Sequence, residues 1–204
     1  MFTEIRLSFF IAIIALLEVG IYFWAAWTAT LKENNYFAIP QKLIFQKCAR
    51  NSGRVSAALN LIILLMIGHF GLKQIYLDKT KLDIFLILMT IFTINHLIHF
   101  FFLSQNFKQK SATIKVSEEK HGIITFVCIT VFPMVLWLFK NLNAVLYTCI
   151  ILHLFNVTCV FLDVLYNKIR CKSKISIHNR FGIIVTTMAC VYVVYRMFLE
   201  LQST

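Results

Sequence analysis

The side chains best suited to chemistry lie in a stretch that is otherwise apolar, residues 84–104. This stretch has no charged residue in 21 positions, yet its second half contains Asn95, His96 and His99. On a helix, steps of three and four residues place side chains in one sector. Imidazoles transfer protons and bind metals near neutral pH, and an amide can orient a substrate. The spacing therefore predicts one polar patch on an apolar helix.

A second polar group lies in residues 144–163, which are also mostly apolar. His153, Asn156 and Asp163 are separated by steps of three and seven, so they form one stripe on a helix. A third apolar stretch carries Glu18 near its middle. Because a lone carboxyl group is costly in hydrocarbon, we expect Glu18 to face the inside of a helix bundle and a partner such as a histidine.

These residues predict an acid–base site that acts on a hydrophobic substrate, of lipid or isoprenoid type, inside a membrane. We assign catalytic roles to two imidazoles and two carboxyl groups: His99, His153, Glu18 and Asp163. We assign substrate binding to three further side chains: Asn95, Asn156 and His96. The imidazoles would act as general bases, the carboxyl groups as acids, and the amides would orient the substrate.

The same side chains leave a metal or a haem open as cofactor. His96, His99 and His153, with a carboxylate, are suitable ligands for Zn or Fe. One b-type haem could take His153 and a histidine of the facing helix as axial ligands. Two stacked haems need histidines about 20 Å apart on one helix, and no such pair occurs in the spans.

Two classes other than an enzyme remain alternatives. A proton-coupled transporter or channel subunit would also use Glu, Asp and His inside its helices. It would be expected to form a homo-oligomer, because one short chain offers few helices to line a pathway. An accessory or assembly protein would use the same polar groups only to hold helices together.

The elements that must position these residues are membrane helices. The chain has 204 residues, of which 59% are hydrophobic and 14% charged, and this is too few charges for the surface of a soluble domain. A membrane span needs about 20 apolar residues. We predict an all-α helix bundle, residues 1–204, that forms one integral membrane domain. Six spans are expected: residues 8–28, 55–72, 84–104, 122–139, 144–163 and 181–199.

The distribution of charge predicts the orientation. The loops after spans one, three and five carry 14 of the 20 Lys and Arg residues, and the opposite side carries five. By the positive-inside rule these loops are cytoplasmic, and both termini are non-cytoplasmic. The net charge of +11 is then explained by orientation and by contact with anionic membrane lipid, not by nucleic acid. A bacterial inner membrane and a eukaryotic endomembrane fit equally well.

Several local features follow from the same spans. Residues 40–50 form either a separate amphipathic helix at the interface or an extension of span two. Thr80 and Asp83 have the spacing of a capping box, which would start span three. Gly68 and Gly71 would allow another helix to approach closely. The six cysteines lack a C-x-x-C pattern and are expected to be reduced.

Overall fold

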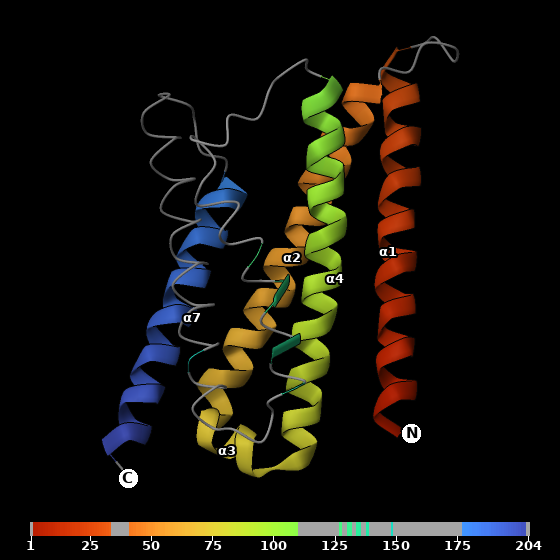
Figure 1. Cartoon of the computed structure of the whole chain (residues 1–204). Coiled ribbons are helices and arrows are strands. Elements are labelled where there is room, and N and C mark those ends of the chain that lie inside the picture. Colours follow the sequence, from red (N-terminus) through yellow and green to blue (C-terminus); the bar gives the residue numbers. More distant parts are fainter. Residues whose placement is uncertain are drawn as a thin grey trace. The chain divides into compact units, whose positions relative to one another are not determined.

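The computed structural model describes three stretches, residues 2–33, 41–109 and 177–202, and seven single residues between 127 and 148. Apart from Gly71 and Asp78, the described part is helical, and it contains no strand. Its helices are listed in chain order: α1 (Phe2–Glu33), α2 (Gln41–Phe70), α3 (Leu72–Leu77), α4 (Lys79–Gln109) and α7 (Ile177–Gln202). Figure 1 shows these five helices with their labels. The all-α prediction is confirmed for this part of the chain.

Four of these helices are long and apolar enough to cross a membrane. The candidate spans are Leu7–Leu31 in α1, Leu43–Phe70 in α2, Lys79–Lys108 in α4 and Arg180–Gln202 in α7. They coincide with the first, second, third and sixth predicted spans. The length and composition of these helices indicate a multi-pass membrane protein. The predicted spans at 122–139 and 144–163 lie outside the described stretches.

The structure decides two local predictions. Helix α2 runs without a break from Gln41 to Phe70, so residues 41–50 extend the span and do not form a separate interfacial helix. The predicted capping box at Thr80 is wrong. Helix α4 begins at Lys79, and Oδ1 of Asp78 accepts hydrogen bonds from the backbone N–H groups of Thr80 (2.9 Å) and Lys81 (3.2 Å). An aspartate directly before the helix is the stronger cap.

Two compact units make up the chain. Within the described residues, the first unit consists of α1, α2 up to Leu59 and α4 from Met89 onwards. Small side chains of α1, Ala25 and Ala29, pack with Ile44 and Cys48 of α2 and with Phe102 of α4. Small residues let helix backbones approach closely, and this strengthens van der Waals packing where no water drives association.

The second unit contains α2 from Asn60, α3, α4 up to Leu88, and α7. Glycines allow the close approach that the sequence predicted. A Cβ added at Gly68 would overlap the ring of Tyr192 in α7, and one at Gly71 would overlap the carboxylate of Glu200. Gly71 has φ 79° and ψ 158°, a conformation that in practice only glycine adopts, and it separates α2 from α3.

The carboxylate of Glu200 caps the N-terminal end of α3. Its Oε2 accepts hydrogen bonds from the backbone N–H groups of Leu72 (3.0 Å) and Lys73 (3.2 Å). This carboxylate thus links α7 to the backbone of α3.

Candidate functional site

The carboxyl group of Glu18 is buried between α1 and α2. Its side chain is 3% exposed, and its Oε1 accepts a hydrogen bond of 2.8 Å from Oγ of Ser52. No donor among the described residues reaches its second oxygen, Oε2. Glu18 therefore faces the inside of the first unit as expected, but its partner there is a serine hydroxyl and not a histidine.

Asn95 binds the same turn of α2 from α4. Its Nδ2 donates one hydrogen bond to Oγ of Ser56 (2.8 Å) and one to the backbone oxygen of Ser52 (3.3 Å). The side chain is 0% exposed, and its Oδ1 has no hydrogen-bond partner in the described stretches. Ser52 consequently holds two of the predicted site residues, one through its hydroxyl and one through its carbonyl.

His99 follows Asn95 by one helical turn of α4, and its imidazole packs against α2. It hydrogen-bonds to the backbone of Ala49 and packs against Gly53, where an added Cβ would be 2.9 Å from its Cε1. Its Nδ1 is buried and finds no hydrogen-bond partner in the described part of the chain. Because Gly53 has no side chain, the imidazole can pack directly on the backbone of α2.

His96 lies beside His99 on α4. Their ring centroids are 5.6 Å apart, and the ring of Phe92 lies 5.8 Å from that of His96 on the other side. The predicted sector is therefore present: Asn95 and His99 contact α2, and His96 adjoins His99. His153, Asn156 and Asp163, the other predicted site residues, lie outside the described stretches.

Three site residues were missed by the sequence analysis: Ser52, Gly53 and Ser56. They share a small size that lets two helices contact one turn of α2. The signal in the sequence was the four-residue spacing of Ser52, Ser56 and Asn60, which repeats polar side chains along one face of a helix. It was overlooked because residues before 55 were assigned to a loop.

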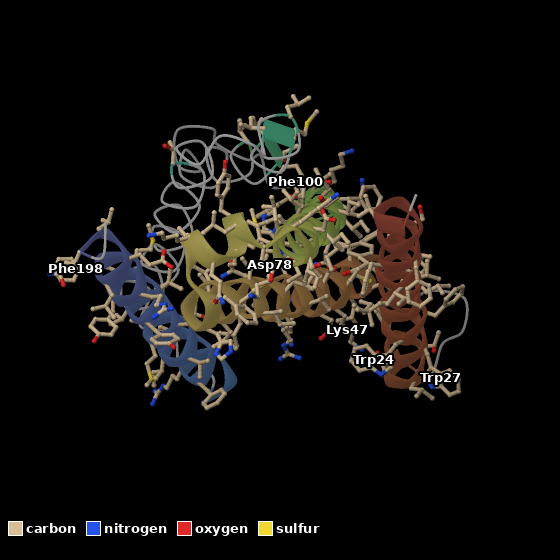
Figure 2. The ribbon with its side chains drawn as sticks, turned by 90° about the horizontal axis from the view of Figure 1, so that it is seen from below. Trp24, Trp27, Lys47, Asp78, Phe100 and Phe198 are labelled. Carbon is tan, nitrogen blue, oxygen red and sulfur yellow. The ribbon has the colours of Figure 1, made fainter. Side chains whose placement is uncertain are left out.

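A further polar contact lies towards the end of α1. Nζ of Lys47 donates a hydrogen bond of 2.8 Å to Oγ1 of Thr28. In Figure 2, Trp24 and Trp27 lie near one end of α1, and both are largely exposed. Exposed indoles beside a lysine are typical of a membrane interface. The contact thus lies at the end of the α1 span that the charge distribution predicts to be near the cytoplasmic headgroups.

The described histidines and carboxylates do not form a complete zinc or iron site. No three His, Cys, Asp or Glu residues in the described stretches come together as a metal site. His96 and His99 supply two imidazoles, so a metal bound by them would need a ligand from the remainder of the chain, such as His153.

Comparisons with known proteins gave no match. No family model, no curated protein and no solved structure is similar to this chain. Conclusions about its function therefore rest on its own residues.

Proposed function

We propose that the chain is an integral membrane enzyme that acts on a hydrophobic substrate, of lipid or isoprenoid type, by acid–base chemistry. One observation carries the proposal: side chains from α1 and α4, Glu18 and His99, contact consecutive residues of α2 and each keeps a buried polar atom without a described partner. Buried ionisable groups within membrane spans are costly and are usually retained for a function.

In this proposal each residue has a distinct chemical role. His99 is the general base, since its Nδ1 has no described partner. Glu18 is the acid, and Ser52 fixes one carboxyl oxygen so that the other faces the substrate. Asn95 is held by two hydrogen bonds and can orient a substrate through Oδ1. Proton transfer between positioned groups of this kind contributes typically 10²–10⁴-fold to a rate.

The proposed bundle is larger than the described part. We propose six spans in one domain, residues 1–204, with both termini on the non-cytoplasmic side. Support comes from the four candidate spans and from the bias of Lys and Arg to alternate loops. His153, Asn156 and Asp163 on the fifth span would then form a second side of the site. Protease accessibility of tags at each terminus, in sealed vesicles of known orientation, tests the topology.

A proton-coupled transporter is less well supported than an enzyme. The hydrogen bonds at the site run from Ser52 to Glu18 and from Asn95 to Ser52 and Ser56. An amide is a poor proton carrier, since it donates without exchanging its hydrogens readily. These hydrogen bonds therefore orient groups and do not form a relay through the described helices.

The enzyme proposal is tested by the lipids of cells that produce the protein. Lipid extracts are compared by mass spectrometry between cells with the wild-type chain, His99→Gln, Glu18→Gln and the control His69→Gln. His69 is an exposed histidine of the α2 span in the second unit. We expect a lipid species that changes with wild type and His69→Gln but not with the two site variants. Identical lipid profiles for wild type and both site variants, at equal protein levels, would contradict the proposal.

A further inference from the structure

Two buried oxygen atoms near Ser52 have no hydrogen-bond donor among the described residues. They are Oε2 of Glu18 and Oδ1 of Asn95, and the two side chains are 3% and 0% exposed. A buried acceptor without a partner costs about 1–3 kcal/mol, and more if it is charged. Both atoms belong to side chains that contact Ser52, and this indicates that something absent from the described chain binds there.

The hydrogen bonds of Ser52 fix which atoms remain available. The backbone oxygen of Ser52 can only accept, so the Asn95 atom that lies 3.3 Å from it must be the amide nitrogen. This orientation leaves Oδ1 free. Similarly, the Ser52 hydroxyl donates to Oε1 of Glu18, and Oε2 has no hydrogen-bond partner among the described residues. Ser52 thus anchors both side chains through one polar atom each, and each retains one oxygen.

The missing partner should be positively charged and small. A buried carboxylate is stable only with a partner that neutralises it. The ammonium group of Lys47, on the same stretch of α2, donates to Thr28, and no described donor reaches Oε2 of Glu18. The available atoms are a carboxylate oxygen, an amide oxygen and the oxygen of the Ser52 hydroxyl, which are all hard oxygen donors suited to an alkali or alkaline-earth cation.

We propose that Glu18, Asn95 and Ser52 bind one small monovalent cation, with sodium as the ion that the site best fits. A single carboxylate balances one positive charge, whereas a divalent ion would leave an uncompensated charge among apolar helices. Sodium sites in membrane helices are built from such side-chain and carbonyl oxygens. The proposal goes beyond the enzyme function, because the ion needs no substrate. Sodium and the catalytic proton would compete for Oε2 of Glu18, so bound sodium would inhibit the proposed enzyme.

The test uses the full-length protein in detergent micelles. Thermal unfolding is measured in sodium chloride and in choline chloride at equal ionic strength. Binding of radioactive sodium is measured on the same samples by equilibrium dialysis. At sodium concentrations several times Kd, we expect Tm to rise by about 2–4 °C and about one ion to bind per chain.

Two variants show whether the ion binds at this site. Glu18→Gln removes the charge but keeps an acceptor for Ser52, and we expect it to lose both the Tm rise and the bound sodium. Asn106→Leu is the matched control. Asn106 is also buried with an unpartnered Oδ1, but it lies 11 residues further along α4, about 16 Å from Asn95. Asn106→Leu should respond to sodium as wild type does.

Three results would overturn the proposal. The first is wild-type protein that binds no sodium in dialysis, which would leave a proton on Glu18 as the occupant. The second is Glu18→Gln that binds sodium as tightly as wild type. If Glu18→Gln does not fold, Asn95→Leu replaces it, and unchanged sodium affinity in that variant is the third. Sodium binding without any change in cellular lipids would support this proposal and contradict the enzyme function, so the two are distinguishable.

Discussion

His99 of α4 lies so close to Gly53 of α2 that a Cβ at position 53 would be 2.9 Å from Cε1 of the imidazole. Real Cβ atoms rarely approach another atom so closely. The imidazole cannot move away freely, because it also hydrogen-bonds to the backbone of Ala49. The position of a predicted site residue therefore depends on a glycine of the neighbouring helix.

Gly53→Ala should destabilise the first unit and displace His99. Alanine gains about 1 kcal/mol over glycine in a helix, but overpacking costs about 1–3 kcal/mol, so we expect a net loss. The matched control is Gly20→Ala, since an added Cβ at Gly20 has nothing within 4 Å and should stabilise. Unfolding by denaturant in micelles measures both. Equal effects of the two substitutions would contradict the packing of His99 on Gly53.

The hydrogen bond between Ser52 and Glu18 should appear as coupling in a double-mutant cycle. Ser52→Ala, Glu18→Leu, which removes the acceptor, and the double variant are compared by the free energy of unfolding. Hydrogen bonds between membrane helices contribute about 0.6 kcal/mol on average and up to about 1.7 kcal/mol. We expect a value towards the upper end, because the Ser52 hydroxyl is the only described donor to the carboxyl group. Additive single effects would show that the two side chains do not interact.

Two buried asparagines of α4 should differ in their response to leucine. Asn95→Leu removes hydrogen bonds to Ser52 and Ser56 and should cost about 1–3 kcal/mol. Asn106→Leu replaces an amide whose Oδ1 has no described partner and should be neutral or stabilising. Thermal unfolding of the two variants is the measurement. A larger loss for Asn106→Leu would mean that the described contacts of Asn95 contribute little.

Gly71→Ala should destabilise the second unit. Its φ of 79° is strained for any side chain, and an added Cβ would also overlap the Glu200 carboxylate that caps α3. The expected cost is about 1–3 kcal/mol. Gly182→Ala, in α7, is the control, because an added Cβ there has nothing within 4 Å. Proteolysis of the α2–α3 junction at increasing temperature reports the difference, and similar curves for both variants would contradict it.

The cap of α4 should make stability depend on acid pH. Hydrogen bonds from Lys81, first from its side chain and then from its backbone, lower the pKa of Asp78 below its ordinary value of 3.8. A lowered pKa in the folded state means that the stabilisation is fully present above the unfolded pKa and is lost as pH falls through the folded pKa. Asp78→Asn keeps a capping oxygen but does not titrate. The two proteins should therefore converge in stability below about pH 4, and parallel pH curves would contradict the role of Asp78.

The sequence predicted the spans better than their ends. Long apolar runs identify α1, α2, α4 and α7, because few other structures accommodate them. The predicted span two begins at residue 55, whereas α2 begins at Gln41, and its extension over residues 40–50 was only one of two alternatives. A helix tolerates charged residues where their side chains reach the interface, and the single Gly53 does not interrupt it. The start of α4 was misplaced by two residues, because two possible caps, Asp78 and Thr80, lie only two positions apart in the sequence.

The site could be predicted in part for a similar reason. Glu18, Asn95 and His99 were recognisable because charged and polar groups are rare inside spans. Their partners were not, since a serine or glycine near the end of a span has many ordinary explanations. Which hydroxyl meets which carboxyl group depends on the rotation of α1 and α4 about their axes, and a sequence without packing information does not specify it.

Ser52 and Gly53 are neighbours in the chain, and together they contact Glu18 of α1 and Asn95 and His99 of α4. Consecutive residues on a helix are separated by about 100° of rotation. One turn of α2 therefore fixes the directions in which α1 and α4 pack around the α2 axis. An insertion of one residue between positions 52 and 53 would rotate Gly53 away from His99 and leave Ser52 in contact with Glu18. The turn of α2 around Ser52 and Gly53 should therefore tolerate substitutions far better than the insertion or deletion of a residue.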